Sequence, residues 1–234
     1  MKRLFCILAT LLLVLSLHSE GTSIVLGTHT DYKDSHFITE VNYIVEAPYS
    51  TLSDVLDELF VGMQKHPTQD AKWAWTGLGR KKSVDEDLNL HENGVKYNAK
   101  TNDYVLTLLI GQPDKDPMSI DIEGFLIRNS RPQTKFLQLG ITKKVKILND
   151  ANFVVSAMPY GKDRSILSVH TSVCFGWFFN MFFTRSRYSS ILEWRIDGFA
   201  RNIENRAENN YKRLLIEKQN ADKNTSGESP TERD

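Results

Sequence analysis

The pattern that most constrains the fold is an alternation of apolar and polar residues that recurs between residues 84 and 175. A period of two is typical of strands that turn one face to a core and the other to water. Residues typical of turns separate the alternating segments, and such short connections favour consecutive antiparallel hairpins. We therefore expect strands near 84–90, 94–98, 103–110, 118–127, 135–147, 152–158 and 164–175.

Another strand and a helix are expected before this run. Residues 37–46 alternate, and Ala47-Pro48 ends the alternation. Ser50 is a candidate cap for a helix that begins there. Its apolar residues recur at helical spacing and form one stripe: Leu52, Val55, Leu56, Leu59, Phe60 and Met63.

A long helix is expected near the C-terminus. Ser190 and Glu193 have the spacing of a capping box. The apolar stripe that follows reaches about Glu217 and holds Leu192, Ile196, Phe199, Ile203, Ala207, Tyr211 and Leu214, with Trp194 beside it. Residues 218–234 are polar, and we expect them to form a disordered tail.

The N-terminus has the pattern of a secretory signal peptide. Lys2 and Arg3 precede an uncharged apolar stretch, which indicates removal of residues 1–21 and a periplasmic or secreted protein. An uncleaved anchor is the alternative, although the apolar stretch is short for a membrane span. Residues 22–35 are then a linker. Without the signal peptide Cys174 is the sole cysteine, so a core rather than disulfides must stabilise the domain.

The balance of charge argues against nucleic acid as a partner. The chain holds 29 Lys and Arg against 29 Asp and Glu. Nucleic-acid binding normally requires a basic surface. The histidines show no ligand spacing, so we expect no metal site, and no motif indicates a cofactor.

The order of elements over residues 36–217 resembles the START-like (helix-grip, SRPBCC) superfamily. The features that carry the resemblance are the first strand, the Ala47-Pro48 break, the helix, the antiparallel strands and the long last helix. Gly176, Trp177 and Asn180 resemble the lipid-transfer START branch more loosely, with a shorter spacing and without the proline that usually follows. The resemblance implies an α+β fold of one domain, in which a curved antiparallel sheet wraps around the C-terminal helix and leaves an apolar cavity.

The alternation indicates which side chains face such a cavity. Lys143 interrupts an apolar face: in a regular strand it projects inward, whereas a β-bulge at Lys143-Lys144 would leave both lysines in water. The residues expected to contact a ligand are Tyr43, Leu139, Ile141, Lys143, Val169, Thr171, Val173, Trp194 and Phe199.

No catalytic triad, metal set or phosphate loop is apparent in the sequence. We therefore expect a non-enzymatic protein that binds a lipid or another apolar small molecule. One alternative is an enzyme of the same superfamily, such as a cyclase or hydrolase acting on a hydrophobic substrate, with Lys143, Thr171 or Tyr43 as polar groups. Another is a structural or partner-binding envelope protein.

Residues 173–183, VCFGWFFNMFF, form an apolar block that is too short to span a membrane, which takes roughly 20 residues. We expect a short helical turn over one end of the cavity, flanked by Arg185 and Arg187, with outer rings that contact a membrane or a partner. The alternative is that every ring packs in the core. The residues expected to form this lid or membrane contact are Trp177, Phe178, Met181, Phe182 and Phe183.

Overall fold

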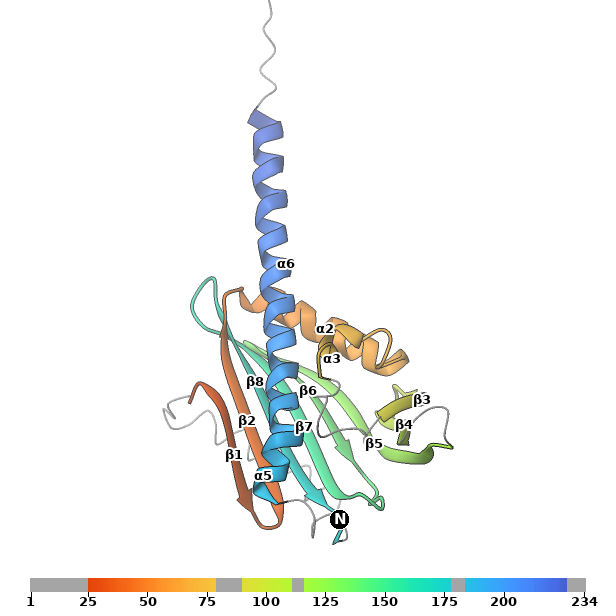
Figure 1. The fold of residues 1–234 in the computed structure, drawn as a ribbon. Helices are drawn as coiled ribbons and strands as arrows, with labels where there is room; N and C mark the ends of the chain where they lie inside the picture. Colours follow the sequence, from red (N-terminus) through yellow and green to blue (C-terminus); the bar gives the residue numbers. More distant parts are fainter. Residues whose placement is uncertain (1–24, 79–89, 111–115, 178–183, 227–234) are drawn as a thin grey trace, which may run out of the picture.

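The computed structural model describes residues 25–78, 90–110, 116–177 and 184–226, and within them it forms a curved antiparallel sheet with helices packed on it (Figure 1). The sheet has eight strands in the order β1-β2-β8-β7-β6-β5-β4-β3. Their bounds are Gly27–Lys33 (β1), His36–Val45 (β2), Leu90–Asn98 (β3), Asp103–Ile110 (β4), Met118–Arg131 (β5), Thr134–Ile141 (β6), Leu148–Pro159 (β7) and Ser165–Phe175 (β8).

The pairing confirms the predicted antiparallel hairpins. Strands β3 to β8 pair consecutively, and β2 pairs with β8, with Phe37 opposite Val173 and Val45 opposite Ser165. The expected strand 135–147 is shorter, because β6 ends at Ile141 and β7 begins at Leu148. Most of the strand expected at 84–90 lies outside the described residues.

The segment expected to be a linker contains the edge strand β1. Gly27 pairs with Asn42 and Lys33 pairs with His36, so β1 and β2 form a hairpin. All of its residues are half-buried or exposed, and the apolar alternation that marks a core strand is absent. Such an edge strand can be held by backbone hydrogen bonds without an apolar face. The linker prediction for residues 22–35 is therefore wrong for β1.

Helix α2 (Tyr49–Lys65) packs the predicted stripe against the sheet, and all six residues of that stripe are buried. Pro48 occupies the N-cap position, where no side-chain cap forms, so the prediction that Ser50 caps the helix is wrong. A proline at a helix start needs no backbone donor there. A single turn, α3 (Lys72–Trp75), follows and packs against the last helix.

The C-terminal helix begins earlier and ends later than predicted. It runs from α5 (Arg185–Tyr188) through a π-helical turn, η1 (Ser189–Glu193), into α6 (Trp194–Ser226). Thr184 caps it by accepting a hydrogen bond from the Arg187 backbone, so Ser190 and Glu193 do not form the predicted capping box. Because α6 reaches Ser226, the tail predicted for residues 218–234 is helical at least that far. The signal peptide predicted for residues 1–21 lies outside the described residues.

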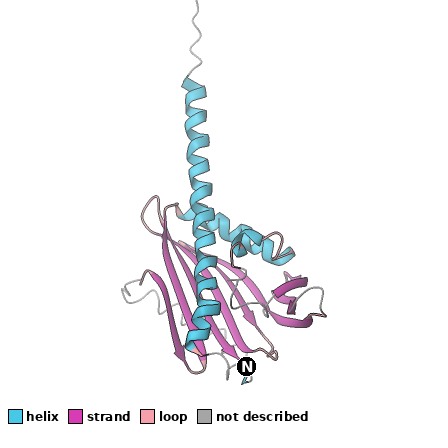
Figure 2. Cartoon of the chain, in the orientation of Figure 1, coloured by secondary structure: helices cyan, strands magenta, loops and turns pink. Residues whose placement is uncertain are grey.

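The main core lies on one face of the sheet, where α2 and α6 pack together on the strands (Figure 2). Val41, Val155 and Leu167 contribute from the strands, and Phe199 and Ile203 contribute from α6. Beyond the sheet, the second half of α6 projects away from the rest of the molecule (Figure 1). Within the described ranges, none of the helices combines the length and the apolar character needed to cross a membrane.

Candidate ligand-binding cavity

An apolar cavity of about 260 Å³ lies between the sheet and the start of the C-terminal helix. The cavity lies beside two apolar clusters, the main core and a smaller one built on Phe37, Phe175 and Tyr188, and Ile196 packs against both clusters. Helix α2 fills the inner face of the sheet at the other end, while α5, η1 and the first turn of α6 cover this end. The cavity is lined by Tyr104, Leu106, Ile122, Gly124, Leu139, Gly140, Ile141, Leu148, Ala151, Asn152, Phe153, Thr171, Val173, Tyr188, Leu192 and Ile196.

Four of the predicted ligand contacts lie in this wall: Leu139, Ile141, Thr171 and Val173. Leu139 and Ile141 come from β6, and Thr171 and Val173 come from the inner face of β8. Two others lie deeper, since Val169 and Phe199 are buried in the main core beside the cavity. The alternation therefore identified the face of the sheet that turns towards the cavity, and that these residues contact a ligand stays a prediction.

Lys143 does not enter the cavity, so its prediction as a ligand contact is wrong, whereas the alternative that leaves Lys143 and Lys144 in water agrees with the structure. Strand β6 ends at Ile141, after which Thr142 donates a hydrogen bond to the Glu123 carbonyl and the chain turns away. The Lys143 side chain is 68% exposed, and its Nζ lies 2.8 Å from Glu123 Oε1. This hydrogen bond raises the pKa of Lys143, so the lysine is an ordinary surface cation.

Trp194 and Tyr43 are absent from the cavity wall. The Trp194 ring lies under the guanidinium of Arg195, whose Cζ is 4.8 Å from the ring centroid. Tyr43 packs against the main core but turns its hydroxyl towards Asp197. Neither residue is among those that line the cavity, so both predictions are wrong.

A polar cluster around Asp197 fastens the first turn of α6 to β1 and β2. Thr28 and Tyr43 donate hydrogen bonds to Asp197 Oδ1. Arg201 Nε donates to Asp197 Oδ2 at 3.0 Å. Burial and the contact with Asp197 raise the pKa of Tyr43 to about 12, so its hydroxyl stays protonated. Partial burial opposes ionisation of Asp197, but these three hydrogen bonds outweigh it, and the pKa of Asp197 is lowered.

We expect Asp197→Asn to lower the free energy of unfolding at pH 7 and to have a smaller effect in acid. The unfolded carboxyl takes up its proton near 3.8, whereas the folded one holds its charge to lower pH. The contribution of ionised Asp197 to stability is therefore complete above the pKa of the carboxyl in the unfolded chain. It is lost as the pH falls through the lower pKa of the carboxyl in the folded protein. Urea unfolding of both proteins at pH 7 and pH 3 measures the difference, with exposed Asp163→Asn as control. An equal effect of Asp197→Asn at both pH values would contradict the assignment.

Several residues of the cavity wall were not predicted. Leu106 and Ile122 alternate in β4 and β5, and that signal could have found them. Tyr188 precedes the π-helical turn and therefore lies ahead of the helix start expected at Ser190. Leu192 lies within that turn, close to the expected start. Ala151 lies near an irregularity in the register between β7 and β8, which the sequence pattern does not reveal.

The apolar block 173–183 is described in part. Val173 lines the cavity, Phe175 is buried, and Trp177 is 75% exposed. Phe178, Met181, Phe182 and Phe183 lie outside the described residues. The prediction that the block covers one end of the cavity and contacts a membrane therefore stays a prediction.

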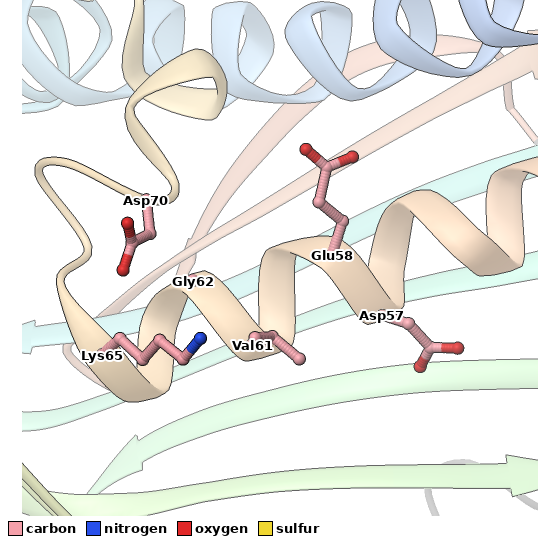
Figure 3. A pocket seen from close by; sticks show the side chains of 6 residues that line it. All are labelled: Asp57, Glu58, Val61, Gly62, Lys65 and Asp70. Carbon is pink, nitrogen blue, oxygen red and sulfur yellow. The ribbon is translucent and has the colours of Figure 1, made fainter.

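A second depression lies along the outer side of α2 (Figure 3) and contains several charged residues. Asp57 and Glu58 point in different directions there. Asp57 forms an ion pair with Lys135, and its Oδ1 lies 3.1 Å from Arg128 Nη1. Glu58 Oε1 lies 2.7 Å from Arg206 Nη2. In the parts of the chain that are described, no group of three or more His, Cys, Asp or Glu could hold a metal ion. The depression is lined by Asp57, Glu58, Val61, Gly62, Lys65 and Asp70.

Comparison with protein-family models finds no match, and comparison with curated proteins finds none either. Among solved structures, a START superfamily protein from Mycobacterium smegmatis is similar with 13% identity and a TM-score of 0.43, covering 74% of this chain and 97% of that one. Norcoclaurine synthase from Thalictrum flavum, in complex with dopamine and hydroxybenzaldehyde, has 15% identity and a TM-score of 0.42, covering 85% of this chain and 94% of that one.

The di-domain aromatase/cyclase BexL from the BE-7585A biosynthetic pathway is similar with 11% identity and a TM-score of 0.44. The match covers 76% of this chain and spans about half of BexL, 51%. The protein from Mycobacterium smegmatis is described as a member of the START superfamily, which the element order of this chain resembles. All three TM-scores lie below 0.5, and the helix-grip description of this chain rests on the order and pairing of its own elements.

Proposed function

We propose that the protein binds a neutral, mainly apolar small molecule in the cavity between the sheet and the C-terminal helix. The observation that carries this proposal is the chemistry of the cavity wall, which is apolar almost throughout and includes no charged side chain among the described residues. Strands and helices form this wall. Concave apolar sites of this kind, with few polar groups, are the usual form of small-molecule binding sites.

The volume of the cavity limits the size of the ligand. Pockets for drug-sized ligands hold roughly 300–1,000 Å³, whereas an apolar cavity of about 150 Å³ admits benzene. At about 260 Å³, this cavity lies between the two. A molecule of one or two rings, or a single slender lipid chain, matches that size. A lipid with two long chains would extend well outside it.

We propose binding without catalysis. The polar side chains in the wall are Tyr104, Asn152, Thr171 and Tyr188. None of these side-chain types normally gains or loses a proton near neutral pH, where a general acid or base is most effective. The enzyme alternative relied on Lys143, Tyr43 and Thr171, and of these three Thr171 alone lines the cavity.

We further propose that the protein is exported, because residues 1–21 have the pattern of a signal peptide. The ligand would then be met in the periplasm or outside the cell.

Filling the cavity tests the proposed site. Val173→Phe adds a ring to the cavity wall, and we expect the affinity for naphthalene to fall at least 10-fold, because the added ring occupies the space of the ligand. The matched control is Val154→Phe on the opposite face of the sheet, where Val154 pairs with His170. Fluorescence titration measures both dissociation constants, and circular dichroism checks that both variants fold.

Unchanged binding by Val173→Phe, or an equal loss in the two variants, would contradict the proposed site. Native mass spectrometry of protein from its own host provides an independent test. A small molecule that co-purifies with the wild type and is missing from Val173→Phe would support the proposal.

A further inference from the structure

A row of hydroxyl groups crosses the inner face of the sheet and ends at the cavity. Thr30, Thr39 and Thr171 are register neighbours on β1, β2 and β8. The Oγ1 atoms of Thr30 and Thr39 are 3.0 Å apart, and Thr39 Oγ1 lies 2.8 Å from the Tyr188 hydroxyl. Thr39 and Tyr188 are fully buried, so this row crosses the interior of the protein.

Thr171 ends this row at the cavity wall. It is 2% exposed and lines the cavity. Its Oγ1 lies near enough to the Tyr188 hydroxyl to affect the pKa of that tyrosine, yet within the described part of the chain it makes no hydrogen bond of ordinary length and angle. Burial raises the pKa of Tyr188, and the neighbouring hydroxyls of Thr39 and Thr171 lower it by less. The Tyr188 hydroxyl therefore keeps its proton, and this end of the row is uncharged. A buried hydroxyl without a hydrogen bond is unfavourable.

Each of the other polar side chains in the wall already makes at least one hydrogen bond within the protein. The Tyr104 hydroxyl donates to the Met63 carbonyl at 2.9 Å. Asn152 Oδ1 accepts a hydrogen bond from Gln138 Nε2 at 3.0 Å. Thr171 is therefore the side chain in the described wall that is best placed to bind a polar group inside the cavity.

We propose that the ligand carries one neutral hydrogen-bonding group, a hydroxyl or a carbonyl, which pairs with the Thr171 hydroxyl while the rest of the molecule is apolar. This inference rests on the proposed function and names the class of its ligand. A threonine hydroxyl can donate or accept, so either group fits. A charged group does not fit, because the described wall has no opposite charge to compensate for its burial.

The test compares two probes that differ by one hydroxyl, naphthalene and 2-naphthol. Thr171→Val keeps the shape of the side chain and removes its hydroxyl. We expect the ratio of the 2-naphthol to the naphthalene dissociation constant to rise roughly 3- to 10-fold, the range for one neutral hydrogen bond. Thr171→Ser restores a hydroxyl and should return the ratio to that of the wild type.

The matched control is Ser168→Ala, which removes a hydroxyl from the outer face of the same strand, where Ser168 Oγ lies 2.6 Å from Asn42 Oδ1. Its ratio should equal that of the wild type. An unchanged ratio in Thr171→Val, with both probes still bound, would overturn the role of Thr171 and leave the proposed function intact. Failure of the wild type to bind either probe would instead overturn the proposed function.

Discussion

Ile203→Ala is expected to lower the free energy of unfolding by roughly 2–5 kcal/mol, the usual cost of truncating a core isoleucine. The same substitution at Ile216, in the same helix, is expected to change it by less than about 0.5 kcal/mol. Ile203 is fully buried in the core between α6 and the sheet, whereas Ile216 is 58% exposed on the projecting half of the helix. The two variants thus compare the same isoleucine-to-alanine substitution at a buried and at an exposed position of one helix.

The cost at Ile203 has two causes. Alanine removes apolar atoms that were withdrawn from water, and it leaves a cavity that the neighbouring side chains fill incompletely. Urea unfolding followed by circular dichroism gives both free energies. Similar losses at the two positions would show that the second half of α6 is packed as tightly as the first, against the arrangement in Figure 1.

This helix shows what periodicity can and cannot predict. The apolar stripe from Leu192 to Leu214 was recognised, and its first part packs on the sheet as expected. Leu214 continues the same period but is 51% exposed. The last part of α6 projects beyond the sheet (Figure 1), and none of the described strands covers it. Periodicity identifies the apolar face of an element, and the length of its neighbours decides how much of that face is covered.

The strands of the core were predictable, whereas the edge strand was not. Strand β2 alternates because one face is buried, with Phe37, Thr39 and Val41 all inside. Strand β1 is held mainly by backbone pairing to β2, and backbone hydrogen bonds leave no pattern in the side chains.

The candidate cavity was predictable to a similar extent. Alternation in β6 and β8 found Leu139 and Thr171, since both strands are regular there. It failed at Lys143 because the end of a strand depends on tertiary pairing rather than on period. It also missed Tyr188, because the early helix start depends on the cap at Thr184 rather than on the capping box of Ser190.

A close approach of two strands forms part of the cavity wall and leads to the second large expected effect. Gly124 on β5 lies opposite Ile141 on β6. A Cβ atom at residue 124 would lie 2.1 Å from the Gly140 carbonyl oxygen. Glycine in a strand often marks such an approach or a bend of the sheet. Both glycines line the cavity, so this approach also shapes the proposed site.

Gly124→Ala should therefore lower the free energy of unfolding by about 3 kcal/mol, near the upper end of the usual cost of overpacking. The obstacle is a backbone oxygen, so relief requires β5 and β6 to separate rather than a side chain to rotate. Gly94→Ala in β3 is the matched control, because a Cβ there meets nothing within 4 Å and its stability should change by less than about 0.5 kcal/mol. Thermal and urea unfolding of both variants measure the effect. If Gly124→Ala is as stable as Gly94→Ala, the two strands do not approach as closely as described, and this side of the cavity wall must be drawn differently.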